Sequence, residues 1–526
     1  MTFSGSIHQA ATAIAATTFH ISPAAMADVV SGISSDSRQV ASGDLFVALV
    51  GERFDGHSFV AQAIAIGAKA AVVSRDWFAA HFPAYPLSSN TAIPEVITAA
   101  DGASGLPLLI VPDTLTAYQQ LGNWWRQQYQ HPVIAVTGSV GKTTTKEMIA
   151  SLLNFYTQPG HSVHKNLANH NNDIGVTQTL LHIDPSRHDF TVTEMGMRGL
   201  GEIARLCRIA QPTIGVITNI GTAHIGRLGS QGMIAQAKCE LLAEMPLDGI
   251  AVLNAHDEWL QTIVPQVWQG KVITYGLGIG DVCGVLHSTP TNSHISPDQN
   301  GNSNHHSPLN THHDSNSILQ VGSYQWHLPL AGAHNALNFL AGLAVLKALD
   351  LDWSQTLNQP ITIDLPAGRA ESYELNQQLL VLDETYNASP EGMIAALHLL
   401  AQTPAKRRWA VLGTMKELGA MSDQLHQQVG HTWASLDLDG LVVWSDGESD
   451  AIMHGANNTQ GSKVSESALC FSCATPENIV QTLLDHVQPG DCVLFKASRS
   501  VGMDRVAQAF RNRWQDLSSQ PQLIFS

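Results

Sequence analysis

Charged side chains are scarce in this 526-residue chain, where Asp, Glu, Lys and Arg make up only 13% of the residues. The 27 Lys and Arg are outnumbered by 44 Asp and Glu, which gives a formal net charge of −17. Because binding along a nucleic-acid backbone needs clustered cationic side chains, this balance argues against a nucleic-acid partner. Anionic small molecules stay compatible with it, since backbone amides and one or two lysines can hold a phosphate in an acidic protein.

Targeting and membrane signals are also missing. No lysine or arginine precedes Arg38, so the basic region of a signal peptide is absent. No apolar run reaches the roughly 18 residues of a membrane span. The six cysteines form no disulfide framework, and we expect Cys470 and Cys473 to be half-buried strand residues rather than a redox or metal pair. These absences predict a cytoplasmic protein without a membrane span.

Strand-like apolar runs alternate with helical patterns along the chain, which predicts an α/β fold with largely parallel sheets. Five of these runs end in glycine or polar residues: Val133–Val136, Ile214–Thr218, Leu379–Leu382, Trp409–Leu412 and Cys492–Phe495. Open α/β sheets bind ligands at the carboxyl ends of their strands. We therefore expect these loops to assemble one site.

One segment differs in composition from the rest. Residues 289–316 are almost entirely Ser, Asn, His, Pro, Thr, Asp and Gly, and we expect a disordered insertion because nothing there can be buried. Several histidines lie in it or beside it, but neither tetrahedral ligand spacing nor supporting carboxylates accompany them, so no metal site is predicted. The shorter polar loop Gly455–Glu466 has the same character.

The sharpest chemical signal is the run T-G-S-V-G-K-T-T-T at Thr137–Thr145, directly after a predicted strand and at the start of a predicted helix. Glycines in such a loop let backbone N–H groups close around phosphates, while Lys142 reaches the transferred phosphate and Thr143 can ligate Mg²⁺. The candidate phosphate-binding residues are Gly138, Ser139, Val140, Gly141, Lys142, Thr143 and Thr144. The loop indicates nucleotide binding without specifying the reaction.

Three further residues carry groups suited to the same chemistry. Glu194 and His224 follow predicted strands, and carboxylate and imidazole are metal-ligating groups. Each of them alone is more often structural than metal-ligating. Lys238 lies on a predicted helix, where spacing alone indicates a solvated surface lysine.

Taken together, these runs resemble the ATP-dependent Mur ligases of peptidoglycan synthesis, whose phosphate loop has the form T-G-[ST]-x-G-K-[ST]. The resemblance covers nearly the whole chain apart from the insertion. It continues in order through Glu194-Met-Gly, Asn219–His224, Ala237–Glu240, Val252–Asn254, Gly332–Asn338, Gly368-Arg369, Asp383 and Lys496–Arg499.

Within the family, Asp383–Met393 and Val411–Gly419 resemble the branch that adds D-alanyl-D-alanine to a UDP-muramoyl-tripeptide. The branch that adds a diamino acid carries an Asp-Asn-Pro-Arg signature, which this sequence lacks. Around Asp36-Ser-Arg38 the sequence resembles the UDP-sugar-binding domain that both branches share. The implied activity is acid–D-amino-acid ligation through an acyl phosphate in peptidoglycan precursor synthesis.

The resemblance also implies residue roles. Lys142 and the loop amides would hold the β- and γ-phosphates of ATP, while Thr143 and Glu194 would ligate one Mg²⁺. His224 would help to ligate a second metal ion, bridged by a carbamate that CO₂ forms on Lys238. This role reverses the interpretation of Lys238 as a surface residue. The implied catalytic set is Lys142, His224, Lys238 and Arg369.

The remaining implied roles concern binding. Asn335 and Asn338 would contact the adenine side, Arg369 the γ-phosphate, and Asp383 the ribose or the domain hinge. Lys496 and Arg499 would approach the phosphates or the incoming dipeptide only after domain closure. The candidate substrate-binding residues are Ser35, Asp36, Ser37, Arg38, Asn172, Asn387, Lys496 and Arg499.

Three α/β domains follow from the resemblance: a UDP-muramoyl-peptide-binding domain at 1–107, a central P-loop ATPase domain with a mainly parallel sheet at 108–360, and a Rossmann-like ligase domain at 361–526. We expect a monomer. A related ligase such as a folylpolyglutamate synthase, a P-loop NTPase switch and a nucleotide-binding scaffold without turnover are the alternatives. The first would lack the Asp36-Ser-Arg38 domain, and the other two would give no ligation product.

Overall fold

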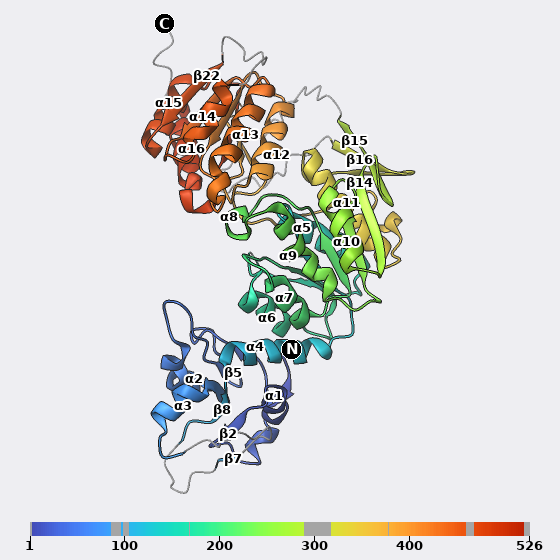
Figure 1. The fold of residues 1–526 in the computed structure, drawn as a ribbon, viewed down its shortest axis with the longest axis vertical. Coiled ribbons are helices and arrows are strands. Elements are labelled where there is room, and N and C mark those ends of the chain that lie inside the picture. Colours follow the sequence, from blue (N-terminus) through green and yellow to red (C-terminus); the bar gives the residue numbers. More distant parts are fainter. Residues whose placement is uncertain are drawn as a thin grey trace.

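The computed structural model describes residues 3–85, 96–97, 105–167, 169–288, 317–376, 378–458 and 468–519. Three large sheets follow one another along the chain and confirm the predicted α/β class with mainly parallel strands. Figure 1 shows them arranged along the long axis of the molecule, with the central sheet between the other two. The predicted disordered insertion at 289–316 lies outside the described residues, as does most of the loop Gly455–Glu466.

The N-terminal sheet has six strands in the order β4-β5-β6-β8-β2-β7. Its strands are β2 (Thr17–Phe19), β4 (Ile33–Ser34), β5 (Leu45–Val47), β6 (Ala70–Ser74), β7 (Val96–Ile97) and β8 (Leu108–Val111). A separate pair, β1 (Gly5–Ser6) with β3 (Val29–Val30), accompanies α1 (Ile7–Ala13), α2 (Val60–Ile66), α3 (Arg75–His81) and the short 3₁₀ turns η1 (Ala25–Ala27) and η2 (Gly56–Phe59). Since β8 lies inside this sheet, the sheet continues past residue 107, where the sequence predicted the first domain to end.

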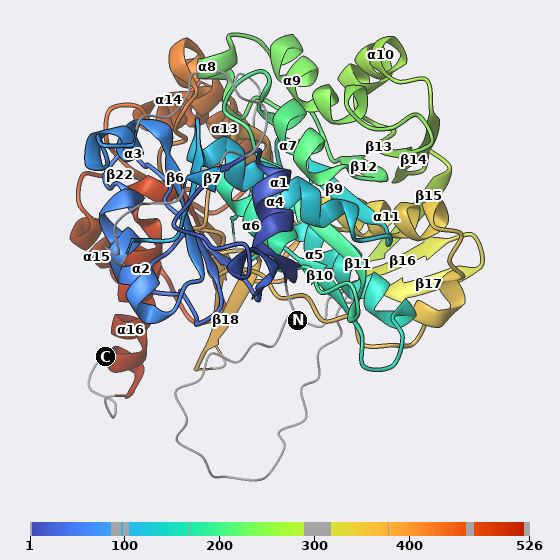
Figure 2. The same cartoon turned by 90° about the horizontal axis from the view of Figure 1, so that it is seen from below.

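Helix α4 (Thr114–Gln127) joins the N-terminal sheet to the central part. It packs on α6 (Asp173–Leu181) and α7 (Glu202–Ala210), and Figures 1 and 2 both show this contact. Trp125 Nε1 donates to the Ile183 carbonyl at 3.0 Å, and the buried Arg126 guanidinium donates to the Ala210 carbonyl at 2.9 Å. These buried hydrogen bonds fix the position of α4 on the central domain.

The central sheet has nine strands in the order β10-β11-β9-β12-β13-β14-β15-β16-β17, of which only the pairs made by β16 and β17 are antiparallel. Its strands are β9 (Val133–Thr137), β10 (Ser162–Lys165), β11 (His188–Glu194), β12 (Ile214–Ile217), β13 (Ile250–Asn254), β14 (Lys271–Leu277), β15 (Val282–Ser288), β16 (Ser317–Val321) and β17 (Tyr324–His327). Strand β9 is buried throughout and lies between β11 and β12. A sheet covered on both faces favours such continuous apolar strands.

Helices cover both faces of the central sheet, as Figure 2 shows. One core contains Ile134 and Val136 with α5 (Lys142–Leu153) and α11 (Ala333–Ala348). On the other face, Val133 and Ala135 share a core with α7, α9 (Gln231–Ala243) and α10 (Glu258–Val267). The short turns η3 (Asn154–Tyr156) and η4 (Trp353–Thr356) and the short helix α8 (Ile225–Leu228) complete the central part.

The C-terminal sheet has six strands in the order β18-β19-β23-β20-β21-β22, and only β18 is antiparallel to its neighbour. Its strands are β18 (Glu371–Leu375), β19 (Leu379–Asp383), β20 (Arg408–Leu412), β21 (Gly440–Trp444), β22 (Leu469–Cys473) and β23 (Cys492–Lys496). The accompanying helices are α12 (Pro390–Gln402), α13 (Ser422–Ser435), α14 (Asp450–Asn457), α15 (Pro476–His486) and α16 (Met503–Ser519), with the turns η5 (Gly419–Met421) and η6 (Arg499–Val501). The carboxyl ends of β20 and β23 are adjacent, where such sheets bind ligands.

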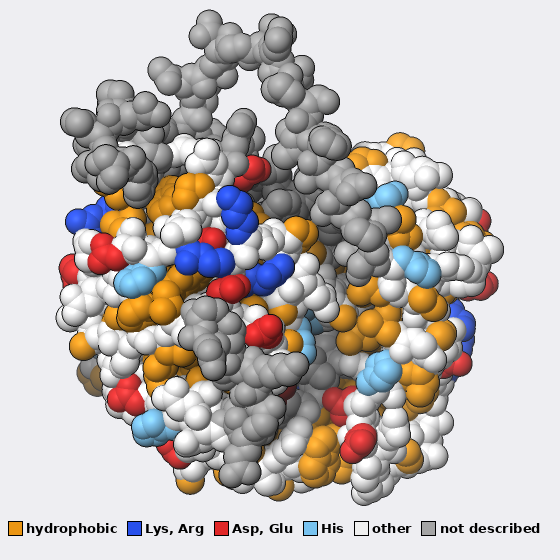
Figure 3. Space-filling view, turned by 90° about the horizontal axis from the view of Figure 1, so that it is seen from above, with side chains coloured by type: hydrophobic (Ala, Val, Ile, Leu, Met, Phe, Trp, Pro, Cys, Tyr) orange, Lys and Arg blue, Asp and Glu red, His pale blue; other side chains and the backbone are white. Residues whose placement is uncertain are grey.

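The five strands expected from the sequence are all confirmed, each to within one residue at either end. Cys470 and Cys473 lie on β22 as free thiols, one partly buried and the other buried. None of the helices within the described ranges has the length and apolar character needed to cross a membrane. On the face drawn in Figure 3, the few charged side chains of both signs are mixed among apolar and neutral ones.

Candidate active site

The phosphate-binding loop connects β9 to α5 and depends on two glycines. Gly138 has φ of +151° and Gly141 has φ of +85°, conformations that favour glycine. A Cβ added to Gly138 would lie 1.8 Å from Thr218 Oγ1, and one added to Gly141 would lie 2.7 Å from Asn338 Oδ1. The loop therefore has room for glycine only, at the positions where the backbone must curve around a phosphate.

Asn219, in the turn after β12, stabilises this loop through hydrogen bonds. Ser139 N donates to the Asn219 carbonyl, and Val140 N donates to Asn219 Oδ1, both at 3.0 Å. Asn219 Nδ2 in turn donates to the Val140 carbonyl at 2.9 Å. The neighbouring turn after β12 and the phosphate loop thus form one rigid unit.

Lys142 begins α5 and folds back over the loop. Its Nζ donates to the Gly138 carbonyl at 3.0 Å and to the Ser139 carbonyl at 3.4 Å. Burial lowers the pKa of Lys142, Glu194 opposes this effect and Arg369 adds to it. The ammonium therefore already occupies the mouth of the loop, where it can exchange carbonyl oxygens for phosphate oxygens.

Thr143 and Glu194 are brought together as the sequence predicted. Thr143 Oγ1 donates to Glu194 Oε2 at 2.7 Å, and Asn171 Nδ2 donates to Glu194 Oε1 at 2.8 Å. The backbone of Glu194 is fixed by Asn166 Oδ1, which accepts from Glu194 N at 2.9 Å. A hydroxyl and a carboxylate at the phosphate loop fit Mg²⁺, which prefers few protein oxygens and completes its shell with water and phosphate. Thr144 follows in the first turn of α5.

His224 lies in the loop after β12, at the interface with the C-terminal domain. Its Nδ1 pairs with Glu417 Oε2, and Arg227 Nη2 lies 3.2 Å from Glu417 Oε1. Burial lowers the pKa of the His224 imidazole, whereas the neighbouring Glu417 carboxylate acts in the opposite direction. The ring nitrogen Nε2 has no hydrogen-bond partner among the described residues, so it is the nitrogen available to a ligand.

Lys238 is buried on α9, with only 2% of its surface exposed. This contradicts the interpretation from spacing alone, which placed it at the surface. Burial lowers the pKa of its amine well below the usual value, and the Lys142 charge acts in the same direction. No ion pair or hydrogen bond to the Lys238 ammonium occurs within the part of the chain that the structure describes. A buried amine of this kind is favoured in its neutral, nucleophilic form.

Asn335 and Asn338 lie in the first turns of α11, beside the phosphate loop. Asn338 Oδ1 accepts from Thr145 Oγ1 at 3.0 Å, and Asn338 Nδ2 donates to Asn335 Oδ1 at 3.3 Å. Asn335 Nδ2 also donates to the Ala331 carbonyl at 2.7 Å. The pair therefore borders the loop on one side, where Asn338 Oδ1 would lie 2.7 Å from a Cβ added to Gly141.

Three cationic side chains of the C-terminal part approach the same region. The Arg369 guanidinium lies 4.0 Å from the centre of the Tyr386 ring, and the Arg499 guanidinium lies 5.6 Å from it. Lys496 Nζ donates to the Asn387 carbonyl at 3.1 Å and pairs with Glu384 at 3.6 Å. Arg369 Nε is buried without a hydrogen-bond partner. Such an unsatisfied donor next to Lys142 is suited to an anionic ligand.

The Asp383 side chain makes its contacts within the C-terminal domain. Its Oδ1 accepts from Thr385 N at 3.2 Å and Thr385 Oγ1 at 2.6 Å, and its Oδ2 lies 3.9 Å from Arg511 Nη2. Burial raises the pKa of Asp383, and these partners oppose the rise. Of the two predicted roles, this geometry favours the hinge over the ribose.

Of the predicted N-terminal substrate residues, Ser35 and Asp36 line a cleft of about 310 Å³ between the N-terminal sheet, α4 and α6, whereas Ser37 and Arg38 do not line it. It is lined by Ser31, Gly32, Ile33, Ser34, Ser35, Asp36, Gln39, Ala41, Asp44, Tyr118, Gln178, Leu181 and His182. Arg38 pairs with Asp36 at 2.7 Å and lowers the pKa of that carboxyl to about 2. Ser37 lies between these two residues, and burial raises the pKa of Tyr118 to about 12.

Two other predicted substrate residues have local roles in the structure. Asn172 caps α6, where its Oδ1 accepts from Gly175 N at 2.9 Å. Asn387 offers its carbonyl to Lys496. Neither side chain has a contact here that identifies a substrate.

Two carboxylates at the site were not predicted from the sequence, although they lie in the ranges Asp383–Met393 and Val411–Gly419 that carry the family resemblance. Glu391, at the start of α12, accepts from Thr222 N at 2.6 Å and from Thr222 Oγ1 at 2.8 Å, and its Oε2 is buried without a partner. Glu417 bonds His224, as described above. Both carboxylates belong to the C-terminal domain and contact the loop after β12. The only sequence signal for such a role is their position inside the D-x-x-Y-N-A-S-P-E and M-K-E-L-G runs.

Ligand clusters of three or more His, Cys, Asp or Glu side chains do not occur within the described ranges. The candidate metal-ligating groups are instead the Thr143 hydroxyl, the Glu194 carboxylate and the His224 imidazole. The hydroxyl and the carboxylate fit Mg²⁺ held partly by substrate phosphates, and the three groups do not form a closed structural site.

The fold and this site define a multidomain P-loop protein in which a second domain delivers cations and carboxylates to the nucleotide loop. Three family models match the chain in order: Mur ligase family, catalytic domain, at residues 29–120; Mur ligase middle domain at 136–346; and Mur ligase, glutamate ligase domain, at 368–499. The chain belongs to the Mur ligase family.

Among curated proteins, the chain is 45% identical to UDP-N-acetylmuramoyl-tripeptide–D-alanyl-D-alanine ligase of Synechocystis sp., over 91% of each chain. It is 33% identical to the ligase of the same name from Escherichia coli, over 91% of this chain and 93% of that one. The structure is similar to that of MurF from Acinetobacter baumannii, with a TM-score of 0.76, 28% identity and coverage of 97% and 99%. MurF of Thermotoga maritima in complex with ADP gives a TM-score of 0.71, 27% identity and coverage of 93% and 99%.

A folylpolyglutamate synthase of Mycobacterium tuberculosis also matches, with a TM-score of 0.53 and 14% identity. It covers 78% of this chain. At that identity the likeness shows a shared fold alone.

Proposed function

We propose that this chain is the ATP-dependent ligase that joins D-alanyl-D-alanine to UDP-N-acetylmuramoyl-tripeptide, giving UDP-muramoyl-pentapeptide, ADP and phosphate. One observation carries the proposal: the phosphate loop meets the cations and carboxylates of the C-terminal domain at one interface. The supporting comparison is the 45% identity to a ligase of that name over 91% of each chain. The reaction belongs to peptidoglycan precursor synthesis, and we place it in the cytoplasm and assign it to a monomer.

A carboxylate does not condense with an amine in water, so the reaction must first activate the carboxylate of the tripeptide. The terminal carboxylate of the tripeptide attacks the γ-phosphorus of ATP, the bond to the β-phosphate oxygen breaks, and an acyl phosphate and ADP result. Two anions must meet in this step, and Lys142 and Arg369 offset their repulsion. The neutral amine of the dipeptide then attacks the acyl carbon, its nitrogen loses a proton to solvent, and the tetrahedral intermediate breaks the bond to phosphate, which leaves the amide.

Mg²⁺ would be held at Thr143 and Glu194, and a second ion at His224 and a carbamate on Lys238. When bound, these ions neutralise phosphate charge during transfer. The carbamate is supported by the lowered pKa of the buried Lys238 amine, because only the neutral amine reacts with CO₂. An acyl phosphate hydrolyses readily, so closure of the C-terminal domain would exclude water and bring Lys496 and Arg499 toward the phosphates or the dipeptide.

The N-terminal cleft would hold the UDP part of the substrate, in a first domain that includes β8 and therefore extends past residue 107. Replacing Arg38 with alanine is then expected to raise the KM for UDP-muramoyl-tripeptide about tenfold, since a charge-assisted contact to an anion is lost. The kcat and the KM for ATP should stay unchanged. Steady-state kinetics with Lys69→Ala, which removes a surface cation of the same domain, provides the matched control. An equal rise in both KM values for Arg38→Ala would contradict this assignment.

Phosphate release by the purified chain tests the proposed function. With ATP and Mg²⁺ present, release should require both UDP-muramoyl-tripeptide and D-alanyl-D-alanine. Replacing the dipeptide with glutamate tests the folylpolyglutamate-type alternative and should give no release. Turnover of ATP that ignores both substrates would contradict the proposal and favour an NTPase switch.

A further inference from the structure

Two residues in left-handed backbone conformation face each other between the central and C-terminal domains. His224 has φ of +69° and Glu417 has φ of +66°. Residues that carry a Cβ seldom adopt this conformation, and where they do they cluster at functional sites. The side chains of this pair are bonded to each other through His224 Nδ1 and Glu417 Oε2.

The backbones beside this pair approach very closely. Gly226 N donates to the Glu417 carbonyl at 3.0 Å. A Cβ added to Gly226 would lie 2.5 Å from Gly419 N, and one added to Gly419 would lie 2.7 Å from Gly226 Cα. The contact between α8 and η5 therefore depends on glycine from both domains, so the interface is shaped to bring Glu417 to His224.

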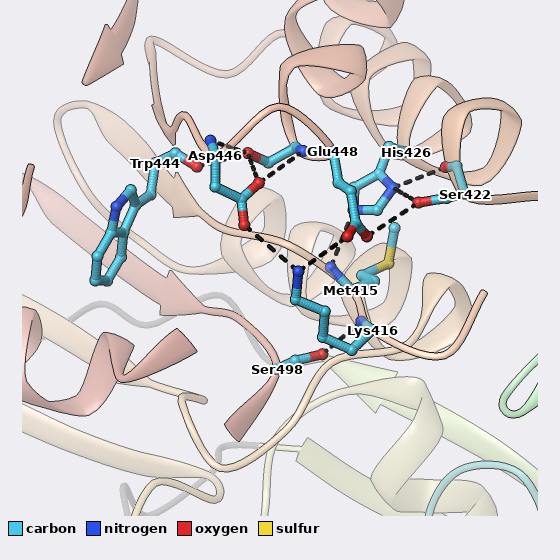
Figure 4. Close-up of polar contacts among 9 residues, drawn as sticks. Met415, Lys416, Ser422, His426, Trp444, Asp446, Glu448 and Ser498 are labelled. Carbon is cyan, nitrogen blue, oxygen red and sulfur yellow. Dashed lines mark hydrogen bonds and ion pairs between the residues drawn. The ribbon is translucent and has the colours of Figure 1, made fainter. Parts of the chain in front are cut away.

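The two residues before Glu417, Met415 and Lys416, are held by several polar contacts, which Figure 4 shows. Met415 N donates to Nε2 of the buried His426 at 2.9 Å, and Lys416 N donates to Ser498 Oγ at 2.9 Å. Lys416 Nζ pairs with Glu448 at 3.1 Å and with Asp446 at 3.6 Å. A side chain presented from such a support keeps a defined orientation.

We propose that Glu417 is a positioning residue that the C-terminal domain supplies to His224, so that the imidazole is correctly oriented only when the two domains are closed. This inference rests on the proposed function. In addition, the C-terminal domain would orient a metal-ligating side chain of the central domain. Closure of the two domains would then be coupled to assembly of the metal site.

The physical reason lies in the two nitrogens of the ring. A carboxylate that accepts from Nδ1–H fixes the tautomer in which Nε2 carries the free lone pair, the form that ligates a metal ion. Nε2 is the ring nitrogen left without a partner among the described residues. Because Lys496 and Arg499 belong to the same domain as Glu417, the cations and the oriented imidazole arrive together.

Binding of Mn²⁺ to the full chain with a non-hydrolysable ATP analogue tests this proposal without turnover. Electron paramagnetic resonance of free Mn²⁺ should reveal two sites in the unaltered protein. Glu417→Ala is expected to weaken the weaker site about tenfold, as for other residues that orient a metal-ligating histidine. Glu417→Gln should stay within about threefold of the unaltered protein, because its amide oxygen still accepts from Nδ1–H.

Two further variants separate orientation of His224 from simple docking of the domains. Arg227→Ala removes the other partner of Glu417 without touching the imidazole, and Glu477→Ala removes an exposed carboxylate of α15; both should leave Mn²⁺ binding unchanged. Thermal unfolding confirms that each variant is folded. The proposal is overturned if Glu417→Ala binds Mn²⁺ normally, if Arg227→Ala weakens it equally, or if only one site exists. Ligation by the unaltered chain, measured in parallel, decides separately whether the proposed function holds.

Discussion

Replacing Lys142 with alanine is expected to lower kcat for ligation by about 10³-fold, the scale seen when a cation that stabilises transferring phosphate is removed. Lys142 is the first residue of α5, and its ammonium already lies over the loop, 3.0 Å from the Gly138 carbonyl. The fold should tolerate the change, since among the described residues this ammonium donates hydrogen bonds only to two carbonyls of the loop itself. Phosphate release and thermal unfolding, measured on the same preparations, check both parts.

Lys271→Ala is the matched control for that experiment. Lys271 is an exposed lysine at the start of β14, in the same domain, and its loss should leave kcat unchanged. If Lys142→Ala kept more than about a tenth of the activity, the loop would not perform the phosphoryl transfer assigned to it.

The second large effect is expected at Lys238. A carbamate needs a primary amine, so Lys238→Arg should lose activity about 10²-fold or more although it keeps a cation. Lys238→Ala should be equally impaired. Ligation assays at low and high bicarbonate add a direct test, since only the unaltered protein should respond to it.

The arginine variant distinguishes two explanations of a buried lysine. If a positive charge near the phosphates were the function of Lys238, Lys238→Arg would keep most of the activity and Lys238→Ala would not. That outcome would contradict the proposed carbamate on Lys238. The second metal ion would then have His224 as its only proposed ligand. Unfolding temperatures are needed here, because Lys238 is 2% exposed and arginine is larger.

Much of the scaffold could be predicted because it depends on local patterns. Continuous apolar runs such as Val133–Val136 can be satisfied only as covered parallel strands, and the glycines of the phosphate loop leave few alternatives to the observed turn. The pairing of Thr143 with Glu194 was implied by the family resemblance, and the structure explains it because β11 lies next to β9 and both strands end at the same edge.

Other features depend on contacts between segments far apart in sequence. Lys238 has the helical spacing of a surface residue, and only the packing of α9 against the central sheet buries it. Glu391 and Glu417 act across a domain interface that no local pattern encodes. The predicted boundary at 107 separates the strand at 108–111 from its partners β6 and β2, which come much earlier in the chain, so no local pattern shows that this strand belongs to the first sheet.

The central claim is that this chain forms a peptide bond between two particular substrates. Mass spectrometry of the UDP-linked product, after incubation with ATP, Mg²⁺, UDP-muramoyl-tripeptide and D-alanyl-D-alanine, tests it most directly. We predict one product heavier than the tripeptide substrate by one D-alanyl-D-alanine less water, formed in equal amount with ADP. ADP formed without that product, or a product extended by a different amine, would contradict it.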